Sequence, residues 1–232
     1  ICLMAIFPGS AIPSAVSDYE IDNSLRFNKA DDPRLTRTPG SSGNRKTWTF
    51  SCWYKNSVVS SHQKILSAGA NADTTNNYTT RLYIDSDPID WLLRFKQDIT
   101  AGNADLSFKL DRLFRDPGAW YHFCVAVDTT QATESNRVKI YINGVLQTSY
   151  DIETYPDQDD DTYVNHTNLH MIGHGEDSID GYLAEVYLID GTMLAASDFG
   201  ELDSDTNQWK PLDSDDVKDA VTFGTNGFFQ KY

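Results

Sequence analysis

Residues 179–194, IDGYLAEVYLIDGTML, contain the clearest strand pattern in the chain. Gly181 precedes eight residues that are apolar except for Glu185, and Asp190-Gly191 follows them. This β-branched and aromatic run between glycines favours a strand over a helix. Strict alternation would place the even-numbered residues from 182 to 188 on a core-facing side. The other side, which also needs partial cover, would contain Leu183, Glu185, Tyr187 and Ile189.

Further strand-like segments occur on both sides of this run, with turn signals between them. The sharpest is a predicted hairpin at residues 137–149, in which Asn143-Gly144 supplies the positive φ values of a type I′ turn. About ten short strands and no long helix predict an all-β fold, an antiparallel β-sandwich. We expect an N-terminal arm (1–20), one sandwich domain (21–200) and a C-terminal tail (201–232) packed on the sandwich or on a neighbouring subunit. The predicted strands outside residues 179–194 and the hairpin are 21–28, 47–55, 64–68, 78–85, 91–96, 105–110, 120–128 and 169–173.

Composition limits the classes of partner. The 232 residues carry a formal net charge of −15, which argues against binding nucleic acid or anionic membranes. No apolar run approaches the roughly 20 residues of a membrane span, so no membrane insertion is expected. The three cysteines show neither a disulfide framework nor zinc-site spacing. Cys52 and Cys124 fall inside apolar strands and are expected to be buried free thiols, the alternative being a bridge between them across adjacent strands.

Acidic clusters are candidate cation sites because calcium takes several oxygen ligands from a loop. One cluster occupies residues 157–161, and another is the D-x-D-x-N of Asp203, Asp205 and Asn207. The latter lacks the glycine and the final glutamate of an EF-hand loop. Asp203 and Asp205 are the candidate metal ligands, against the alternative that they are solvated loop residues.

Aromatic residues are candidate stacking surfaces for sugar rings. Strand aromatics are more often core residues, but Tyr141 and Tyr187 lie opposite the main apolar face of their strands. With Leu183 and Ile189 they form a candidate carbohydrate-binding or subunit-interface surface, and so apolar a face predicts contact with another chain or with the terminal tail. On this prediction, Tyr187→Asp would disturb assembly more than folding. The other aromatic residues that could stack on a sugar ring are Trp53, Trp91 and Tyr83.

Catalytic signals are weak. The chain contains no G-x-S-x-G, H-E-x-x-H or phosphate-binding glycine loop. A glycosidase needs two carboxylates beside one bond, and Glu185 has no acidic neighbour two residues away. The expectation is therefore a protein that is not an enzyme and has no catalytic residues.

Taken together, the segments resemble a laminin-G-like, concanavalin-A-like lectin domain over residues 21–200. The resemblance is carried by SLRF, WTFSCWYK, WYHFCVAVD, the VKIYINGVLQ hairpin and IDGYLAEVYLIDGTML, with Asp180, Gly181, Glu185, Val186 and Leu194 in its last motif. It implies a jelly-roll sandwich, a family tendency to bind calcium at the sandwich rim, and carbohydrate as a ligand class.

The terminal segments MAIFPGSAIPSAVSDYEIDNSLRF, SDFGELDSDTNQWKP and TNGFFQKY resemble virion structural proteins of tailed phages, particularly marine ones. This resemblance implies a tail fibre, head fibre or capsid decoration protein at the virion surface. It also implies self-association, contacts with other virion proteins, and adhesion to host surface glycans. The alternatives are a free-standing microbial lectin with a calcium-assisted sugar site and, third, a glycan hydrolase or lyase on the same fold.

Overall fold

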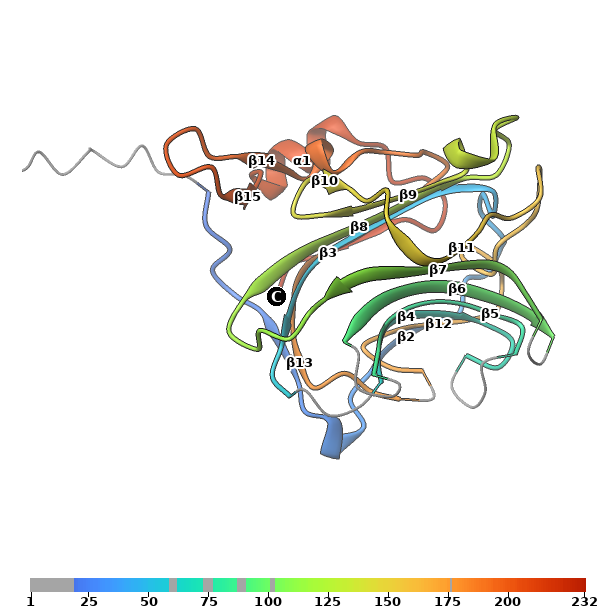
Figure 1. Cartoon of the computed structure of the whole chain (residues 1–232), viewed down its shortest axis with the longest axis horizontal. Helices are drawn as coiled ribbons and strands as arrows, with labels where there is room; N and C mark the ends of the chain where they lie inside the picture. The colour runs from blue at the N-terminus through green and yellow to red at the C-terminus, as the bar shows by residue number, and fades with distance from the viewer. Residues whose placement is uncertain (1–18, 59–61, 73–76, 87–90, 101–102, 176) are drawn as a thin grey trace, which may run out of the picture.

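The computed structural model describes residues 19–58, 62–72, 77–86, 91–100, 103–175 and 177–232. Two antiparallel seven-stranded sheets pack face to face, as predicted (Figure 1). Sheet A has the order β1-β13-β3-β8-β9-β10, and β16 also pairs with β13. Sheet B has the order β11-β7-β6-β5-β4-β12-β2, and β14 and β15 form a separate ribbon.

The elements have the following bounds. Sheet A contains β1 (Leu25–Phe27), β3 (Thr47–Asn56), β8 (Trp120–Asp128), β9 (Val138–Ile142), β10 (Val145–Leu146), β13 (Gly181–Asp190) and β16 (Phe228–Gln230). Sheet B contains β2 (Leu35–Arg37), β4 (Gln63–Gly69), β5 (Thr79–Asp85), β6 (Leu92–Thr100), β7 (Asn103–Leu113), β11 (Tyr150–Thr154) and β12 (Leu169–Ile172). The ribbon is β14 (Gly200–Leu202) with β15 (Trp209–Pro211), the helix is α1 (Ser214–Ala220), and 3-10 turns occupy Lys29–Asp31, Glu134–Asn136 and Ala196–Asp198.

The main core lies between the two sheets and follows from alternation in the long strands. Trp48, Phe50 and Tyr54 of β3 point inward and are fully buried. Phe95 of β6 meets Trp48 edge-on, with ring centroids 5.8 Å apart. A full aromatic side chain taken out of water stabilises the fold by roughly 1.5–3 kcal/mol, so these rings hold the sheets together.

The predicted faces of β13 are correct from Val186 to Ile189 and wrong before the bulge, where alternation predicts Leu183 on the outer side. Ala184 pairs with Trp53 but Tyr187 pairs with Ser51, so β13 has one extra residue, a β-bulge. Glu185 occupies the bulge with a φ of +44°. Leu183 therefore points into the main core, as do Val186 and Leu188, whereas Tyr187 and Ile189 point to the outer face of sheet A. Leu183 thus does not share a face with Tyr187 and Ile189.

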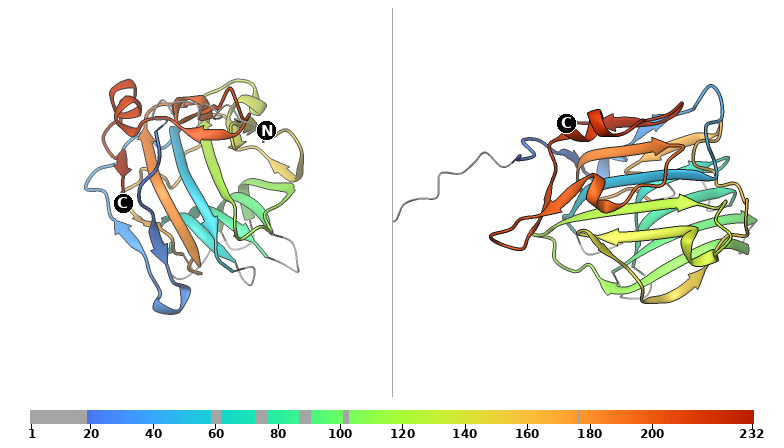
Figure 2. Two further views of the ribbon diagram at one scale, coloured as in Figure 1. Left: turned by 90° about the vertical axis from the view of Figure 1, so that its left-hand side faces the viewer. Right: turned by 90° about the horizontal axis from the view of Figure 1, so that it is seen from above.

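The segment after β13 covers the outer face of sheet A. In the view from above, the orange-to-red part of the chain crosses this face (Figure 2). Its apolar residues form a second core with Tyr187, Ile189 and Cys124. Tyr187 stacks on Phe229 of β16 with ring centroids 4.4 Å apart, and it is only 2% exposed. The remaining members of the second core are Ala196, Phe199 and Val217, with Tyr141, Leu194, Trp209, Leu212, Val221 and Phe223 packed around them.

Sheet B presents a row of charged side chains on the face turned away from the core. Arg81 and Asp98 form a buried ion pair across β5 and β6, and Lys96 contacts the same carboxylate at 2.8 Å. Arg94 pairs with Asp85 at 3.0 Å. A buried charge is costly without a partner, so each of these side chains depends on the oppositely charged one on the neighbouring strand.

The two strand cysteines are buried free thiols, as expected from the sequence. Cys52 and Cys124 are free and buried, Cys52 in the main core and Cys124 in the second core, on opposite faces of sheet A. Burial raises the pKa of both thiols. Among the described residues, no helix has the length and apolar character needed to cross a bilayer.

Candidate functional site

Three tryptophans meet on the outer face of sheet A. Trp53 of β3 and Trp120 at the start of β8 belong to the sheet, and Trp209 of β15 lies over it. Trp53 is 8% exposed and Trp120 is 36% exposed, so Trp120 presents the larger accessible surface. Trp120 also packs against Tyr182 of β13, with ring centroids 6.4 Å apart. We call the hollow around these residues the three-tryptophan groove.

His122 positions two of the tryptophans. Its ring lies 5.1 Å from that of Trp53 and is stacked with that of Trp209 at 5.8 Å. Trp209 Nε1 donates a hydrogen bond of 3.0 Å to His122 Nδ1. An indole nitrogen can only donate, so Nδ1 is the acceptor and the ring proton is on Nε2, which donates to Ser51 Oγ at 2.8 Å. Burial lowers the pKa of His122 to about 3, and the ring is therefore neutral at ordinary pH.

Two glycines make room for Trp209. A Cβ atom at Gly144 would lie 2.3 Å from the Trp209 ring, and one at Gly200 would lie 2.7 Å from it. Gly144 also has a φ of +77°, as the type I′ turn requires. The Asn143-Gly144 turn predicted from the sequence therefore has a second role, since it seats a ring from a distant segment.

The groove has two lobes that share the three tryptophans. The first lobe has a volume of about 550 Å³ and the second about 510 Å³. Each is within the range of about 300–1,000 Å³ that is typical of small-molecule sites. The first lobe is lined by residues 19–24, Ala184, Lys210 and Pro211, and the second by Asn143, Val145, Leu202, Asn207 and Gln208.

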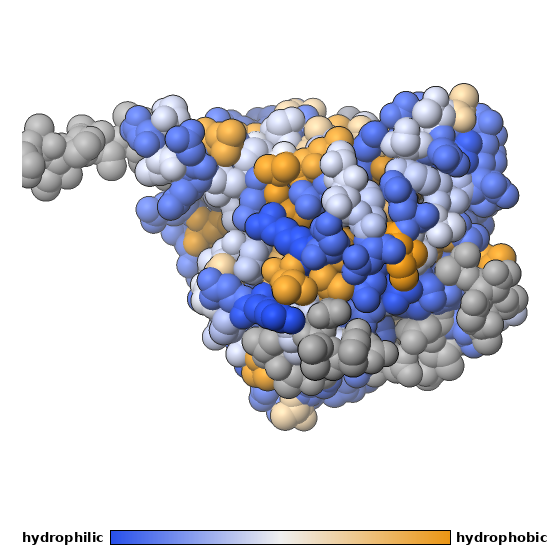
Figure 3. All heavy atoms as spheres, viewed as in Figure 1, coloured by the Kyte–Doolittle hydropathy of each residue, from blue (hydrophilic) through white to orange (hydrophobic). Residues whose placement is uncertain are grey.

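Apolar side chains at the mouth of the groove are unusually exposed. Val145 and Leu202 are each 62% exposed, and with Trp120 they border the second lobe. Figure 3 shows small apolar patches on an otherwise mostly hydrophilic face, one of them beside β14 and β15. Exposed apolar surface rimmed by polar groups is typical of a binding site. Sugar rings present apolar CH faces to aromatic rings and hydroxyls to amides, and this groove offers both kinds of partner.

The candidate residues on the apolar face have a different place. Tyr187 and Ile189 are buried under the C-terminal segment, and Tyr141 is partly buried at its edge. Leu183 lies in the main core. The described part of the chain itself covers this surface, so Tyr187 and Ile189 do not face a ligand or a second chain. Of the aromatic residues considered from sequence, Trp53 is the one that reaches the groove.

Asp203 and Asp205 lie in the turn between β14 and β15. The Asp203 carboxylate accepts hydrogen bonds from the backbone of Asp205 and Thr206 at 3.0 and 2.8 Å, and lies 3.6 Å from Lys210 Nζ. Hydrogen bonds donated by Thr206 lower the pKa of Asp203. Across the residues that the structure describes, no three His, Cys, Asp or Glu side chains are grouped to hold a metal ion. The Asp203 carboxylate thus binds groups of its own turn and Lys210, and the assignment of Asp203 and Asp205 as metal ligands stays a prediction.

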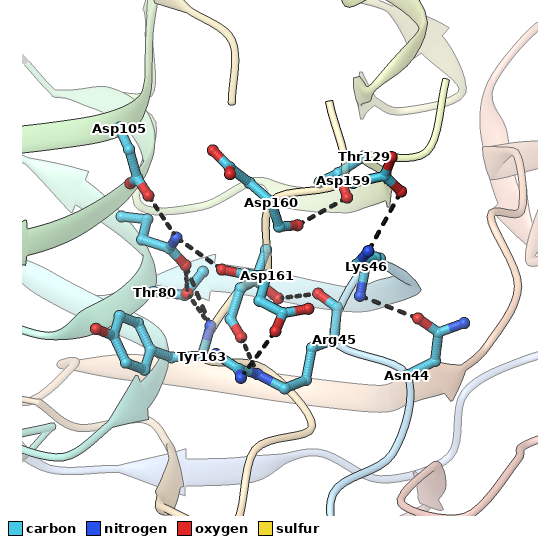
Figure 4. Close-up of polar contacts among 12 residues, drawn as sticks. Asn44, Arg45, Lys46, Thr80, Asp105, Thr129, Asp159, Asp160, Asp161 and Tyr163 are labelled. Atoms are coloured by element: carbon cyan, nitrogen blue, oxygen red, sulfur yellow. Dashed lines mark hydrogen bonds and ion pairs between the residues drawn. The ribbon is translucent and has the colours of Figure 1, made fainter. Parts of the chain in front are cut away.

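The acidic loop at residues 157–161 is tied to the rim of the sandwich (Figure 4). Lys46 contacts Asp159 at 3.2 Å, and Arg45 contacts Asp161 at 3.0 Å. Thr129 Oγ1 donates to the backbone carbonyl of Asp160 at 2.7 Å. The carboxylates of Asp159, Asp160 and Asp161 therefore have cationic or loop partners that hold the loop in place.

Glu185 contacts Tyr19, one of the residues that line the first lobe. It is 2% exposed and accepts a hydrogen bond from the hydroxyl of Tyr19, whose oxygen in turn accepts a hydrogen bond from Ser214 Oγ at 3.0 Å. Burial raises the pKa of Glu185. This contact joins the segment before β1 to the bulge of β13 and to α1, and it supports the wall of the first lobe that Tyr19 forms.

The two-sheet antiparallel sandwich agrees with the family to which the sequence is matched. A family profile described as the concanavalin A-like lectin/glucanases superfamily matches residues 30–197. The chain belongs to this superfamily. No curated protein matches the sequence.

Solved structures share the fold at low sequence identity. Domain 4 of AbnA, a GH43 extracellular arabinanase from Geobacillus stearothermophilus, in complex with arabinotriose, is 16% identical with a TM-score of 0.50, and the alignment covers 77% of this chain and 75% of that domain. Domains LG4-5 of mouse laminin α1 are 12% identical with a TM-score of 0.50, over 91% of this chain and 47% of theirs. Tailspike protein 2 of Escherichia coli O157:H7 bacteriophage CAB120 is 16% identical with a TM-score of 0.47, over 76% and 23%. This chain thus spans less than half of the latter two.

Sequence reasoning missed Trp120 and Trp209 as groove residues. Trp120 reads as the first residue of a core strand, although a strand's first residue is often at the sheet end and accessible. Trp209 lies in a polar stretch without periodicity. The one available signal was Gly144, because a glycine in a hairpin can also accommodate a ring that packs on it.

Proposed function

We propose that this chain is a carbohydrate-binding module without enzymatic activity, which holds a glycan in the three-tryptophan groove. The observation that carries the proposal is the accessible Trp120 ring beside Trp53 and Trp209, with amides around it. A domain of the same fold was solved with a bound trisaccharide, which supports this ligand class. Glu185 is buried under Tyr19 rather than presented to a bound sugar, which supports binding without hydrolysis.

Removing Trp120 tests the proposal. Tryptophan hot spots contribute about 2 kcal/mol or more, so Trp120→Ala should weaken glycan binding about 30-fold. Leu113→Ala is the control, because Leu113 of β7 is 43% exposed and belongs to the other sheet. Both variants and the parent chain would be titrated with a panel of oligosaccharides by calorimetry. Equal affinity of the two variants, or no binding by the parent chain, would refute the proposal.

The same titrations address the two alternatives from sequence. Binding that disappears with EDTA and returns with calcium would favour the calcium-assisted lectin. Release of reducing ends from any oligosaccharide, lost in Glu185→Gln, would favour an enzyme. Neither effect is expected here.

We further propose that the module is displayed on the surface of a tailed-phage virion, where it adheres to host glycans and contacts itself and other virion proteins. The resemblance of the terminal segments to such proteins supports this role. Residues 201–232 pack against sheet A of the same chain, and Tyr19 and Glu20 line the groove. We therefore assign the attachment to residues 1–18, which lie outside the described residues. Quantitative mass spectrometry and antibody labelling of purified particles would test it, and absence from the particle would refute it.

A further inference from the structure

The lining of the three-tryptophan groove points to a more specific ligand than a sugar in general. We propose that the groove selects neutral, linear oligosaccharides long enough to occupy both lobes, and discriminates against anionic glycans. This inference rests on the proposed function, since it names the glycan class that the groove takes. It is carried by the charges of the lining and by the way the lobes meet.

The charged residues of the first lobe are mostly acidic. Glu20 and Asp22 line it and are exposed. Lys210 is the cation of this lining, and its ammonium group lies 3.5 Å from Glu201 and 3.6 Å from Asp203. An arriving carboxylate or sulfate would therefore meet two acidic side chains and a lysine already held by two others. The net charge of −15 adds repulsion at longer range.

The polar residues of the second lobe are amides. Asn207 and Gln208 offer donors and acceptors without charge, as sugar hydroxyls require. Asn143 is partly used by the fold, because its side-chain oxygen accepts from the backbone N–H of His122 at 2.7 Å. This set can recognise uncharged hydroxyls and has no cation to balance an acidic sugar.

The lobes are arranged for a chain of sugars. Both include Trp53, Trp120 and Trp209 in their walls, so a ligand that fills the two lobes must cross the tryptophans. A monosaccharide can fill only one of them. Additional sugar rings that enter the other lobe would add contacts without losing translational and rotational freedom a second time. The affinity for the oligosaccharide should therefore rise with its length.

Charge selection is tested with hexasaccharides. Cellohexaose, maltohexaose and arabinohexaose are the neutral probes, and hexagalacturonate is the anionic probe. At low ionic strength the anionic probe should bind at least about tenfold more weakly than the best neutral one, and about 0.5 M salt should narrow the difference. The double variant Glu20→Gln/Asp22→Asn should raise the ratio of anionic to neutral affinity.

Length selection is tested with the best neutral series from disaccharide to hexasaccharide. Gln208 of the second lobe is exposed, and Gln208→Ala should lower the ratio of hexasaccharide to disaccharide affinity about three- to tenfold, the net value of one hydrogen bond. If hexagalacturonate binds as tightly as the neutral probes in a Trp120-dependent manner, or if length has no effect, this inference is wrong and the proposed function stands. If no probe binds in a Trp120-dependent manner, both are wrong.

Discussion

Replacing His122 by glutamine should remove much of the protein's loss of stability in acid. The His122 ring is fully buried between Trp53, Trp209 and Ser51, and burial lowers its pKa to about 3. In the unfolded chain a histidine has a pKa of about 6.5. Between pH 3 and pH 6.5 the histidine is therefore protonated in the unfolded chain and neutral in the folded chain.

The sign and size of the effect follow from proton linkage. A pKa that is depressed in the folded state gives stability that is complete above pH 6.5 and is lost as the pH falls towards 3. With 1.36 kcal/mol per pKa unit, acidification from pH 7 to pH 4 should lower the free energy of unfolding by about 3 kcal/mol through His122 alone. Glutamine does not titrate, so His122→Gln should lack this contribution at every pH.

The assay is urea unfolding at several pH values from 4 to 7, followed by tryptophan fluorescence. Trp209→Phe is the matched control, because it also removes the hydrogen bond to His122 Nδ1 but keeps the imidazole. Both variants should be less stable than the parent chain at pH 7. Only His122→Gln should show a flatter pH dependence, by about 3 kcal/mol over this interval. The same slope in His122→Gln and the parent chain would contradict the assigned burial and neutrality of the ring.

Three further substitutions test other parts of the fold. Gly144→Ala should lower stability by about 1–3 kcal/mol, because its Cβ would lie 2.3 Å from the Trp209 ring at a φ of +77°, whereas Gly40→Ala, with nothing within 4 Å, should be neutral in the same urea titration. Tyr187→Asp should destabilise the isolated chain by at least about 3 kcal/mol, with a melting temperature independent of protein concentration, since Tyr187 is buried against Phe229. The 44%-exposed Tyr78 provides the control variant Tyr78→Asp, and an effect on association without a loss of melting temperature would restore the interface prediction. Asp98→Asn should lower the free energy of unfolding by about 3–5 kcal/mol, because it weakens the buried pair with Arg81. Asp215→Asn is the control, since it removes an exposed pair with Lys218 and should give no measurable change. Equal losses in the two variants would contradict the difference expected between buried and exposed pairs.

The sandwich was predictable where strands are long and their pattern is strong. Residues 47–55 and 120–128 became β3 and β8 almost without change, and Asn143-Gly144 forms the turn expected between β9 and β10. Short strands were missed. No strand is predicted within residues 34–46 or 151–163, but β2 lies wholly within the first segment and β11 partly within the second. Edge strands with exposed, polar side chains lack the alternation of a buried face.

The site was less predictable because it depends on contacts between distant segments. Ala184, Glu185 and Val186 carry no signal of a bulge, since an apolar run reads the same with or without one inserted residue. Trp209 has no periodic neighbours, and its partner His122 reads as one residue of an apolar strand. The apolar face that contains Tyr187 is predicted to contact another chain or the terminal tail, and in the structure the C-terminal segment of the same chain covers it.

The position of Trp209 and β16 late in the chain has a consequence for synthesis. When residues up to 200 have left the ribosome and residues 201–232 have not, thirteen strands of the two sheets are available to pair, but Tyr187 still lacks Phe229 and the groove still lacks its third tryptophan. The nascent sandwich would then expose an apolar outer face, which a chaperone could recognise. Completion of residues 201–232 buries that face and builds the groove in one event. A product that lacks residues 201–232 would therefore be prone to aggregate and unable to bind through this groove. The same segment thus covers the apolar face and completes the binding groove.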